Sequence, residues 1–283
     1  MRRFTALIFL SLIFAVSPAG AQKTSTPPVV QSPGQSLAPG SIFKECKNCP
    51  QMVVVPAGIY IMGLGGKGRH GPPHRVNFKR PFAVGRYEVK FSEWFACVRD
   101  EVCIHQPHDH KWGRIGRPVI NITWHQAKNF TKWLSKKTGF VYRLPTEAEW
   151  EVAAKGGKEI IYSWGNEVQS GKANFCDHHC EKRWNAKQFS DGFETTAPVG
   201  SFPPNGYGLH DMGGNVYEWV FDWYGKEYYG RSPAKNPKGP LKGKYKVMRG
   251  GSWINYPVGT RPTDRTDAKP GKRLNFAGFR CVK

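Results

Sequence analysis

One segment, residues 203–219 with the sequence PPNGYGLHDMGGNVYEW, constrains this chain more than any other. Its glycines and asparagines tolerate tight turns with positive φ, so we expect a loop with little regular structure. Asp211, Asn215 and Glu218 then place three oxygen ligands within eight residues. Oxygen donors on a glycine-rich loop are how proteins commonly bind calcium. On spacing alone the segment is either a calcium site or a solvated acidic turn.

Together with RGGSW at 249–253 and GFR at 278–280, this segment resembles the formylglycine-generating-enzyme family, also called sulfatase-modifying factors. Four more blocks agree in order: MVVVPAG at 52–58, PFAVGRYEV at 81–89, PVINITW at 118–124 and RLPTEAEWE at 143–151. The resemblance implies an α+β, C-type-lectin-like fold that is compact and low in regular secondary structure. We therefore expect one formylglycine-generating-enzyme-like domain over residues 43–283.

The start of the chain reads as an export signal. Residues 1–21 combine Arg2 and Arg3, an apolar stretch too short to span a bilayer, and a small-residue cleavage site at 19–21. Residues 22–42 are rich in Pro, Ser, Thr and Gln, which is typical of a disordered linker. We expect an exported protein, periplasmic or secreted, without a transmembrane segment.

The net charge of +21 is spread along the chain. No basic run is interleaved with aromatic residues, so we expect no nucleic-acid partner. Two interpretations of the charge remain open: attraction to an anionic peptide, glycan or envelope component, or simply a basic, soluble surface. The oligomeric state does not follow from the sequence.

Two helices are predicted from their caps. Thr123 can cap a helix whose apolar face is Trp124, Ala127, Phe130 and Leu134. Thr146 and Glu149 form a capping box for a second helix that ends at Gly156. We expect the glutamates of the second helix to be structural.

The seven cysteines favour local disulfides, because an exported protein meets an oxidising compartment. The expected pairs are Cys97–Cys103, Cys176–Cys180 and Cys46–Cys49. Zinc is an alternative for Cys46 and Cys49 with the CDHHC run at 176–180, and HQPHDH at 105–110 is a second possible metal cluster. In the family, the position matching Cys281 pairs with a helical cysteine, which the resemblance places at Thr131 here. We therefore expect Cys281 to be a free thiol.

The resemblance breaks down where the family's chemistry resides. Family members that make formylglycine oxidise a substrate cysteine with copper(I) held by two thiolates shortly after the Gly-Gly-Ser motif. Here that stretch is WINYPVGTRP at 253–262, and no cysteine occurs between Cys180 and Cys281. The first thiol position corresponds to Asn255 and the second falls near 258–260. We expect neither copper nor cysteine-to-formylglycine oxidation.

The family's calcium positions are retained. The resemblance implies one site from the Asn174 side chain, the Phe175 carbonyl, Asp191 and the Phe193 carbonyl. It implies a second site from Asp211, the Gly213 carbonyl, Asn215 and Glu218. We expect calcium at both, in a structural role.

Seven residues are candidates for lining a ligand pocket: Tyr217, Arg249, Ser252, Trp253, Asn255, Arg261 and Arg265. Arginines can clamp a carboxylate or sulfate by two-pronged hydrogen bonds. Alternatively, Arg261 and Arg265 form ion pairs with Asp264, Asp267 or Glu218. A binding module and an envelope-associated partner protein are therefore favoured. The alternative is an oxidative tailoring enzyme, either formylglycine-generating or pyoverdine-maturation-like.

Overall fold

A computed structural model describes residues 37–66 and 69–283. The expected signal at 1–21 and the linker up to residue 36 lie outside the described residues. The fold begins before residue 43, because the Gly40 amide donates to the Val54 carbonyl at 2.8 Å and the Val54 amide donates to Ser41 at 3.1 Å. The last residues of the expected linker are therefore hydrogen-bonded to the domain.

The strands form three small sheets. The first has the order β1 (Ile42–Phe43), β2 (Met52–Val55) and β5 (Phe82–Gly85), and the second is the hairpin of β3 (Gly58–Met62) and β4 (His74–Phe78). The third has the order β8 (Arg265–Ala268), β7 (Lys246–Arg249), β6 (Tyr217–Trp223) and β9 (Ala277–Gly278). All pairs are antiparallel except β6 with β9, which is parallel. This confirms the expected α+β class with modest regular structure.

Three α-helices pack on these sheets: α1 (Phe91–Arg99), α2 (Trp124–Thr138) and α3 (Glu147–Lys155). Thr123 and Thr146 form capping boxes at the starts of α2 and α3, and Gly156 ends α3 at a φ of 60°. The four apolar residues predicted to form the inner face of α2 are all buried. Two 3₁₀ turns, η1 (Tyr228–Arg231) and η2 (Pro257–Thr260), complete the elements.

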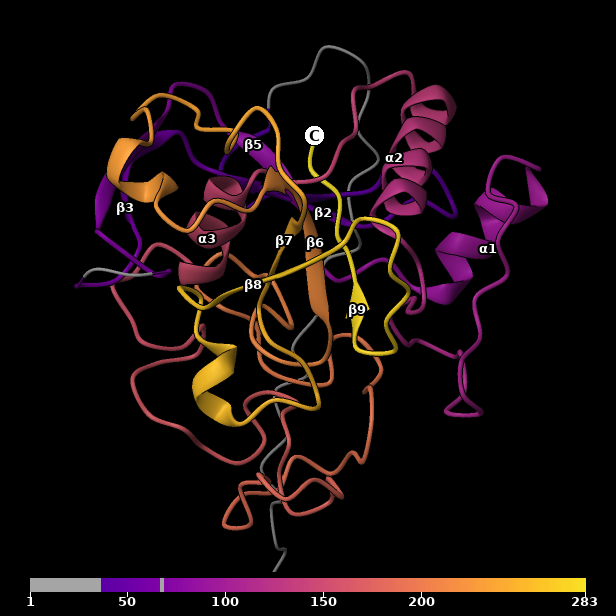
Figure 1. Cartoon of the computed structure of the whole chain (residues 1–283). Coiled ribbons are helices and arrows are strands. Elements are labelled where there is room, and N and C mark those ends of the chain that lie inside the picture. Colours follow the sequence, from indigo (N-terminus) through magenta and orange to yellow (C-terminus); the bar gives the residue numbers. More distant parts are fainter. Residues whose placement is uncertain (1–36, 67–68) are drawn as a thin grey trace, which may run out of the picture.

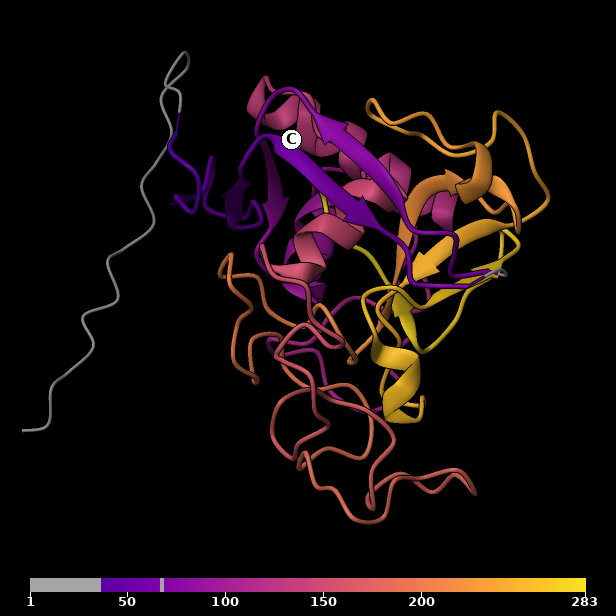
Figure 2. The same cartoon turned by 90° about the vertical axis from the view of Figure 1, so that its left-hand side faces the viewer.

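The stretch 156–216, described throughout, contains no helix or strand. Figures 1 and 2 place its salmon-coloured loops at one end of the molecule, below the sheets. A small apolar cluster around Phe175, with Ala173 and Ala186, packs within it. Its loops can therefore present polar groups to ions or ligands without disturbing the main core.

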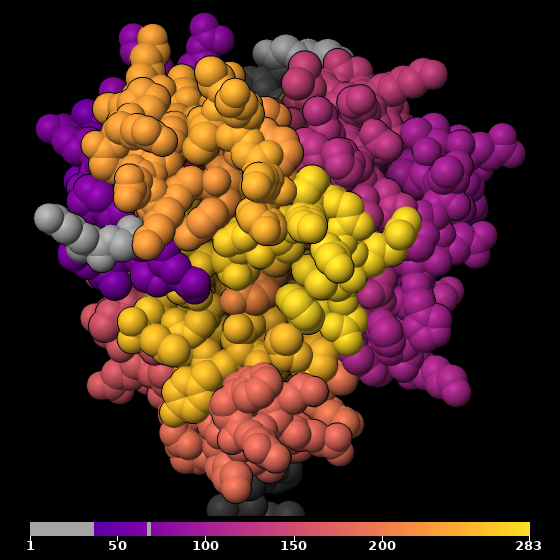
Figure 3. Space-filling model, in the orientation of Figure 1, coloured from indigo at the N-terminus to yellow at the C-terminus, as the bar shows by residue number. Residues whose placement is uncertain are grey.

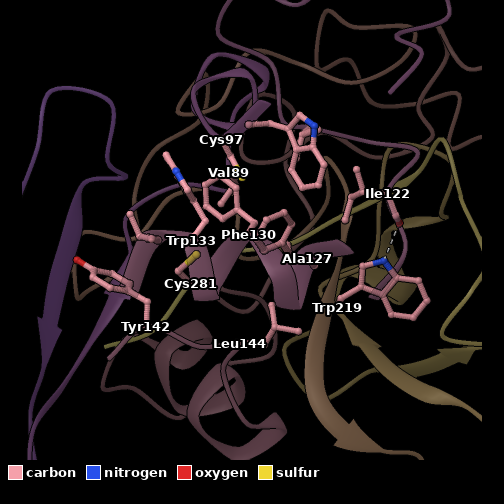
Figure 4. Packing of buried hydrophobic residues seen from close by; sticks show 14 of the residues in the cluster. Val89, Cys97, Ile122, Ala127, Phe130, Trp133, Tyr142, Leu144, Trp219 and Cys281 are labelled. Atoms are coloured by element: carbon pink, nitrogen blue, oxygen red, sulfur yellow. Dashed lines mark hydrogen bonds between the residues drawn. The ribbon is translucent and has the colours of Figure 1, made fainter. Parts of the chain in front are cut away.

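The main core lies between α1, α2 and the first and third sheets. Cys281 is fully buried there and unpaired, as expected, and Figure 4 shows it among Phe130, Trp133 and Tyr142. The C-terminal third of the chain covers much of the face seen in Figure 3. Within the described residues, none of the helices has the length and apolar character needed to cross a membrane.

Candidate functional site

A cluster of carboxylates lies at the buried start of β6. Glu218 accepts from Arg280 at 2.7–2.9 Å and from Trp150 Nε1 at 2.7 Å. Asp211 and Glu88 lie close together and close to Arg280: Asp211 raises the pKa of Glu88, and Arg280 lowers the pKa of both acids. All three acids are at most 6% exposed. Three carboxyl groups therefore lie around one guanidinium, and the raised pKa values of two of them show that full ionisation is opposed unless a further cation is present.

Part of this cluster has no hydrogen-bond partner. Both carboxylate oxygens of Glu88 and Oδ1 of Asp211 are buried and unpaired, while Asp211 Oδ2 accepts from the Gly200 amide at 2.7 Å. Burial raises the pKa of Glu88 well above its usual range and that of Asp211 to about 6. Unpaired carboxylate oxygens with surplus negative charge are the donor set that a hard cation such as calcium binds. These residues fit the expected metal.

The loop that carries Asp211 is itself strained. Asp211 and Asn215 both have a φ of 56°, in the left-handed region that few residues other than glycine adopt. Aspartate and asparagine tolerate this region better than most residues. Such strain is typical of ligand-binding loops, where surrounding structure holds the backbone in place.

The side chain of Asn215 does not belong to this cluster, although the sequence predicted it as a ligand of the second calcium site. Its Oδ1 accepts from the Ala197 amide at 2.9 Å and from Asn174 Nδ2 at 3.4 Å. Asn215 therefore joins the loops around Asn174 and Ala197. Sequence reasoning missed Glu88, although it lies within the quoted block at 81–89. Gly213 packs tightly, since an added Cβ would meet the Thr260 carbonyl at 2.8 Å.

The four residues expected at the first calcium site do lie together. Asp191 accepts from the Phe175 amide at 2.9 Å and from the Phe193 amide at 2.8 Å. Oδ1 of Asn174 is buried without a partner. Burial, with a smaller contribution from nearby Asp177, raises the pKa of Asp191 to about 7. An unpaired amide oxygen beside a desolvated carboxylate also fits a cation.

The disulfides remove the cysteine ligands of the zinc alternative and leave Asp177, His178 and His179, whose ligand atoms lie within 4.8 Å of one another. Disulfides join Cys46 to Cys49, Cys97 to Cys103 and Cys176 to Cys180, which confirms the expected pairs. The thiolates that zinc would need are therefore consumed. With Cys281 buried and free, all seven cysteines of the chain are accounted for.

Arg249 and Arg265 are not pocket residues, contrary to expectation. Both guanidinium groups are fully buried and bind α3. Arg249 donates to Glu147 at 2.8 Å and to Glu151 at 2.6 Å, and Arg265 donates to Glu147 at 2.5 and 2.8 Å. The partner of Arg265 is therefore none of the three acids proposed from the sequence. These contacts fasten β7 and β8 to α3, so the α3 glutamates are structural, as predicted.

Three other candidates form a hydrogen-bonded chain. Ser252 Oγ donates to Asn255 Oδ1 at 2.7 Å, and Asn255 Nδ2 donates to the Tyr217 hydroxyl at 3.1 Å. Burial, followed by the nearby Asp264, raises the pKa of Tyr217 to about 12. The position corresponding to the first copper thiolate thus carries an amide held by two hydroxyl groups.

Arg261 lies beside this chain, on a cavity of about 310 Å³ whose other lining residues include Arg69, His70, Val258 and Asp264. Asp264 pairs with Arg69 at 3.7 Å and with His70 at 3.3 Å. Within 37–66 and 69–283, Arg261 forms no ion pair, and its buried Nε has no acceptor. The alternative ion pair for Arg261 is therefore not formed, and its guanidinium is open to an anion.

A row of rings leads from Trp253 to the surface. Trp253 meets Trp112 edge-on at 5.2 Å between ring centroids, Trp112 lies 5.0 Å from His110, and His110 lies 4.8 Å from His108. His108 and His110 are exposed, and the Asn121 side chain contacts both residues. The second possible metal cluster is instead an aromatic row with hydrogen bonds to Asn121.

Comparisons with known proteins agree with this geometry. The family model for the sulfatase-modifying factor enzyme 1-like domain matches residues 39–283. The chain is 38% identical to the formylglycine-generating enzyme of Streptomyces coelicolor over 178 residues, or 60% of this chain and 54% of that protein. It is 29% identical over 287 residues to the mouse "inactive C-alpha-formylglycine-generating enzyme 2", covering 82% and 85% of the two chains.

Among solved structures, PvdO from Pseudomonas aeruginosa superposes with a TM-score of 0.74 at 34% identity, covering 87% of this chain and 99% of that one. The curated relatives are often longer: the chain spans about half of the Streptomyces enzyme and a quarter of the protein kinase pkn1 of Chlamydia pneumoniae, to which it is 40% identical over 174 residues. The matched domain accounts for the whole described fold. The chain belongs to the sulfatase-modifying factor family, whose members include the formylglycine-generating enzymes.

Proposed function

We propose that this protein is an exported, calcium-stabilised family member that binds an anionic ligand beside Arg261 and does not oxidise cysteine to formylglycine. The observation that carries the proposal is that the chain has no accessible thiol. Six cysteines are in disulfides and the seventh is 0% exposed. Export is proposed from residues 1–21 and the oxidised cysteine pairs.

The absence of accessible thiols argues against copper chemistry. Copper(I) needs soft sulfur ligands with an open position for substrate. Burial raises the pKa of the Cys281 thiol well above its usual range, so the thiolate form is disfavoured. The mouse relative named as inactive is a precedent for a family member without the oxidase.

Calcium would be held by the unpaired oxygens of Glu88 and Asp211, beside the Glu218–Arg280 pair, and by Asn174 and Asp191 in the first site. When bound, the ion supplies positive charge to carboxylates that are otherwise buried in excess. These residues hold the loops 172–193 and 211–218 in place around η2, and hence shape the cavity beside Arg261.

An anionic ligand is supported by the unpaired guanidinium of Arg261. A buried donor without an acceptor is rare in native proteins and is usually completed by solvent or a ligand. Tyr217 lies close enough to Asp264 and Arg69 of this cavity for their charges to affect its pKa, and Val258 and Leu64 add apolar lining. Arginine and aromatic residues together suit a carboxylate-bearing peptide or an acidic glycan of the envelope.

The copper-loaded protein is expected to leave a sulfatase-type Cys-x-Pro-x-Arg peptide unchanged, because no thiolate pair can hold copper(I). Mass spectrometry for the aldehyde product measures this, with an active formylglycine-generating enzyme as the positive control. Turnover that survives Cys281→Ser would contradict the proposal and support the alternative, an oxidative tailoring enzyme with another ligand set. That alternative is favoured by the similarity to the Streptomyces enzyme.

Arg261→Ala is expected to weaken binding of an alternating Glu-Gly peptide about tenfold, which corresponds to one charge-assisted hydrogen bond of roughly 1.4 kcal/mol. Calorimetric titration at two salt concentrations measures this, with the neutral Gln-Gly peptide as a ligand control. Arg99→Ala, an exposed arginine at the end of α1, is the matched control. Equal affinities in wild type and Arg261→Ala, with unchanged melting temperatures, would rule out this site.

A further inference from the structure

A larger cavity lies on the other side of α3 from the Arg261 region, and its volume is about 590 Å³. It is formed by the β4–β5 turn, the start of α3, β6, the segment 235–238 and Lys283. In Figure 1 the C-terminus lies near the top, whereas the yellow turn of η2 lies at the lower left. Its volume falls within the range of small-molecule sites, which is about 300–1,000 Å³.

Six basic residues line this cavity: Lys79, Arg80, Arg143, Lys235, Lys238 and Lys283. The acidic lining residue is Glu149, and it is fully engaged. Arg143 donates to its two oxygens at 2.6 and 2.7 Å, and the Thr146 amide donates to it at 2.8 Å. Glu149 therefore neutralises Arg143 and has no oxygen left for the other cations.

Lys283 pairs with Glu45 at 2.5 Å. The other four cations, Lys79, Arg80, Lys235 and Lys238, have no counter-ion in the described parts of the chain. They converge from two segments that are distant in sequence. The Asn77 amide donates to the Ala234 carbonyl at 2.7 Å, and the Asn236 amide donates back to Asn77 at 3.2 Å. These backbone bonds fix the segment 234–236 against β4, so the two pairs of cations are held at the same rim.

The floor of the cavity is apolar. Phe78 and Phe82 are largely buried and pack at a tilt with 5.2 Å between ring centroids, while Phe221 of β6 is 37% exposed. An exposed phenyl group such as that of Phe221, surrounded by basic side chains, is not explained by solubility alone. A concave site with low-dielectric walls and one sign of charge concentrates ions of the opposite sign.

We propose that this cavity binds a phosphate or diphosphate ester that carries two or more negative charges on an apolar group. The lysines and Arg80 neutralise the oxyanion, and Phe78, Phe82 and Phe221 receive the apolar part. Compact, multiply charged oxyanions match several ammonium groups better than a single carboxylate does. The site is separate from the cavity at Arg261 and does not depend on the function proposed for it.

The test uses the mature domain and geranyl diphosphate, with inorganic pyrophosphate as the probe that lacks the apolar part. Lys79→Gln/Lys235→Gln is expected to weaken binding of both probes at least tenfold, because two of the charges at the rim are removed without loss of volume. Phe221→Ser is expected to weaken geranyl diphosphate alone. Lys132→Gln/Lys136→Gln, on the exposed side of α2, removes the same charge elsewhere and is expected to change affinity less than twofold.

Arg261→Ala separates this proposal from the previous one, because it leaves geranyl diphosphate binding intact if the two sites are distinct. Sedimentation with phosphatidylcholine vesicles, with and without phosphatidic acid, distinguishes a lipid headgroup from a free ester. Binding to the anionic vesicles that is lost in Lys79→Gln/Lys235→Gln assigns the lipid source, and binding to the soluble probes alone assigns a free ester. Failure of every probe to bind, or equal affinity in the double variant, overturns the proposal.

Discussion

Glu147→Gln is expected to lower the free energy of unfolding by roughly 3–5 kcal/mol, the usual cost of breaking a buried ion pair on one side. Glu147 accepts from Arg249 and Arg265, and all three side chains are at most 2% exposed. The amide would keep the shape of the carboxylate but leave Arg265 without its carboxylate partner and Arg249 with Glu151 alone. Urea unfolding followed by tryptophan fluorescence measures the loss.

The matched control is Glu159→Gln, because Glu159 is 76% exposed and lies 3.8 Å from Lys155. Exposed pairs contribute little, so this variant should unfold close to wild type. Adding Arg265→Met to Glu147→Gln is expected to recover part of the loss by removing one uncompensated charge. Equal stability of Glu147→Gln and Glu159→Gln would show that the buried network does not hold β7 and β8 to α3.

The same network gives a pH dependence with a definite sign. Burial opposes ionisation of Glu147, but Arg265 and Arg249 outweigh it and lower its pKa. A lowered pKa contributes stability that is present above the unfolded value of about 4.3 and is lost as pH falls through the folded value. The stability difference between wild type and Glu147→Gln is therefore expected to shrink in acid, which urea unfolding at several pH values measures.

The elements that could be predicted from sequence are those fixed by local chemistry. The capping boxes of α2 and α3 need only residues three positions apart, and both form as expected. The disulfides close loops of three to six residues, so short spacing was sufficient to identify the pairs. The Asn174 and Asp191 set also lies within one loop region.

Features that depend on distant segments could not be derived in this way. Glu147 and Arg265 are 118 residues apart, and no local pattern links them. Glu88 reaches the β6 cluster only because residues 85–89 lie against the C-terminal segment 279–281. The Val89 amide donates to the Phe279 carbonyl there at 2.9 Å. The basic cavity is likewise created by pairing of β4 with residues 234–236. Its basic residues are scattered along the sequence, where they are consistent with no more than a basic, soluble surface.

Calcium at saturating concentration is expected to stabilise the protein by roughly 2.7 kcal/mol at one hundred times Kd, because only the folded state assembles the ligands. For a domain of this size that corresponds to a rise in melting temperature of about 5–11 °C over the chelated protein. The physical reason is the surplus charge at Glu88, Asp211 and Glu218, where three buried carboxylates share one guanidinium. Differential scanning calorimetry with calcium, magnesium or chelator measures the shift, and magnesium should give a smaller one because it demands a rigid octahedral set.

Two substitutions assign that shift to its sites. Asp211→Asn removes the charge behind one unpaired oxygen and is expected to abolish most of the calcium-dependent rise, whereas Asp191→Asn is expected to remove the part contributed by the first site. Glu159→Gln, which changes an exposed acid, should retain the full shift. The absence of any difference between calcium and chelator would contradict calcium stabilisation. A full shift that persists in both Asp211→Asn and Asp191→Asn would place the ion elsewhere. The buried carboxyl groups would then be neutralised by protons, which the raised pKa values of Glu88 and Asp211 allow.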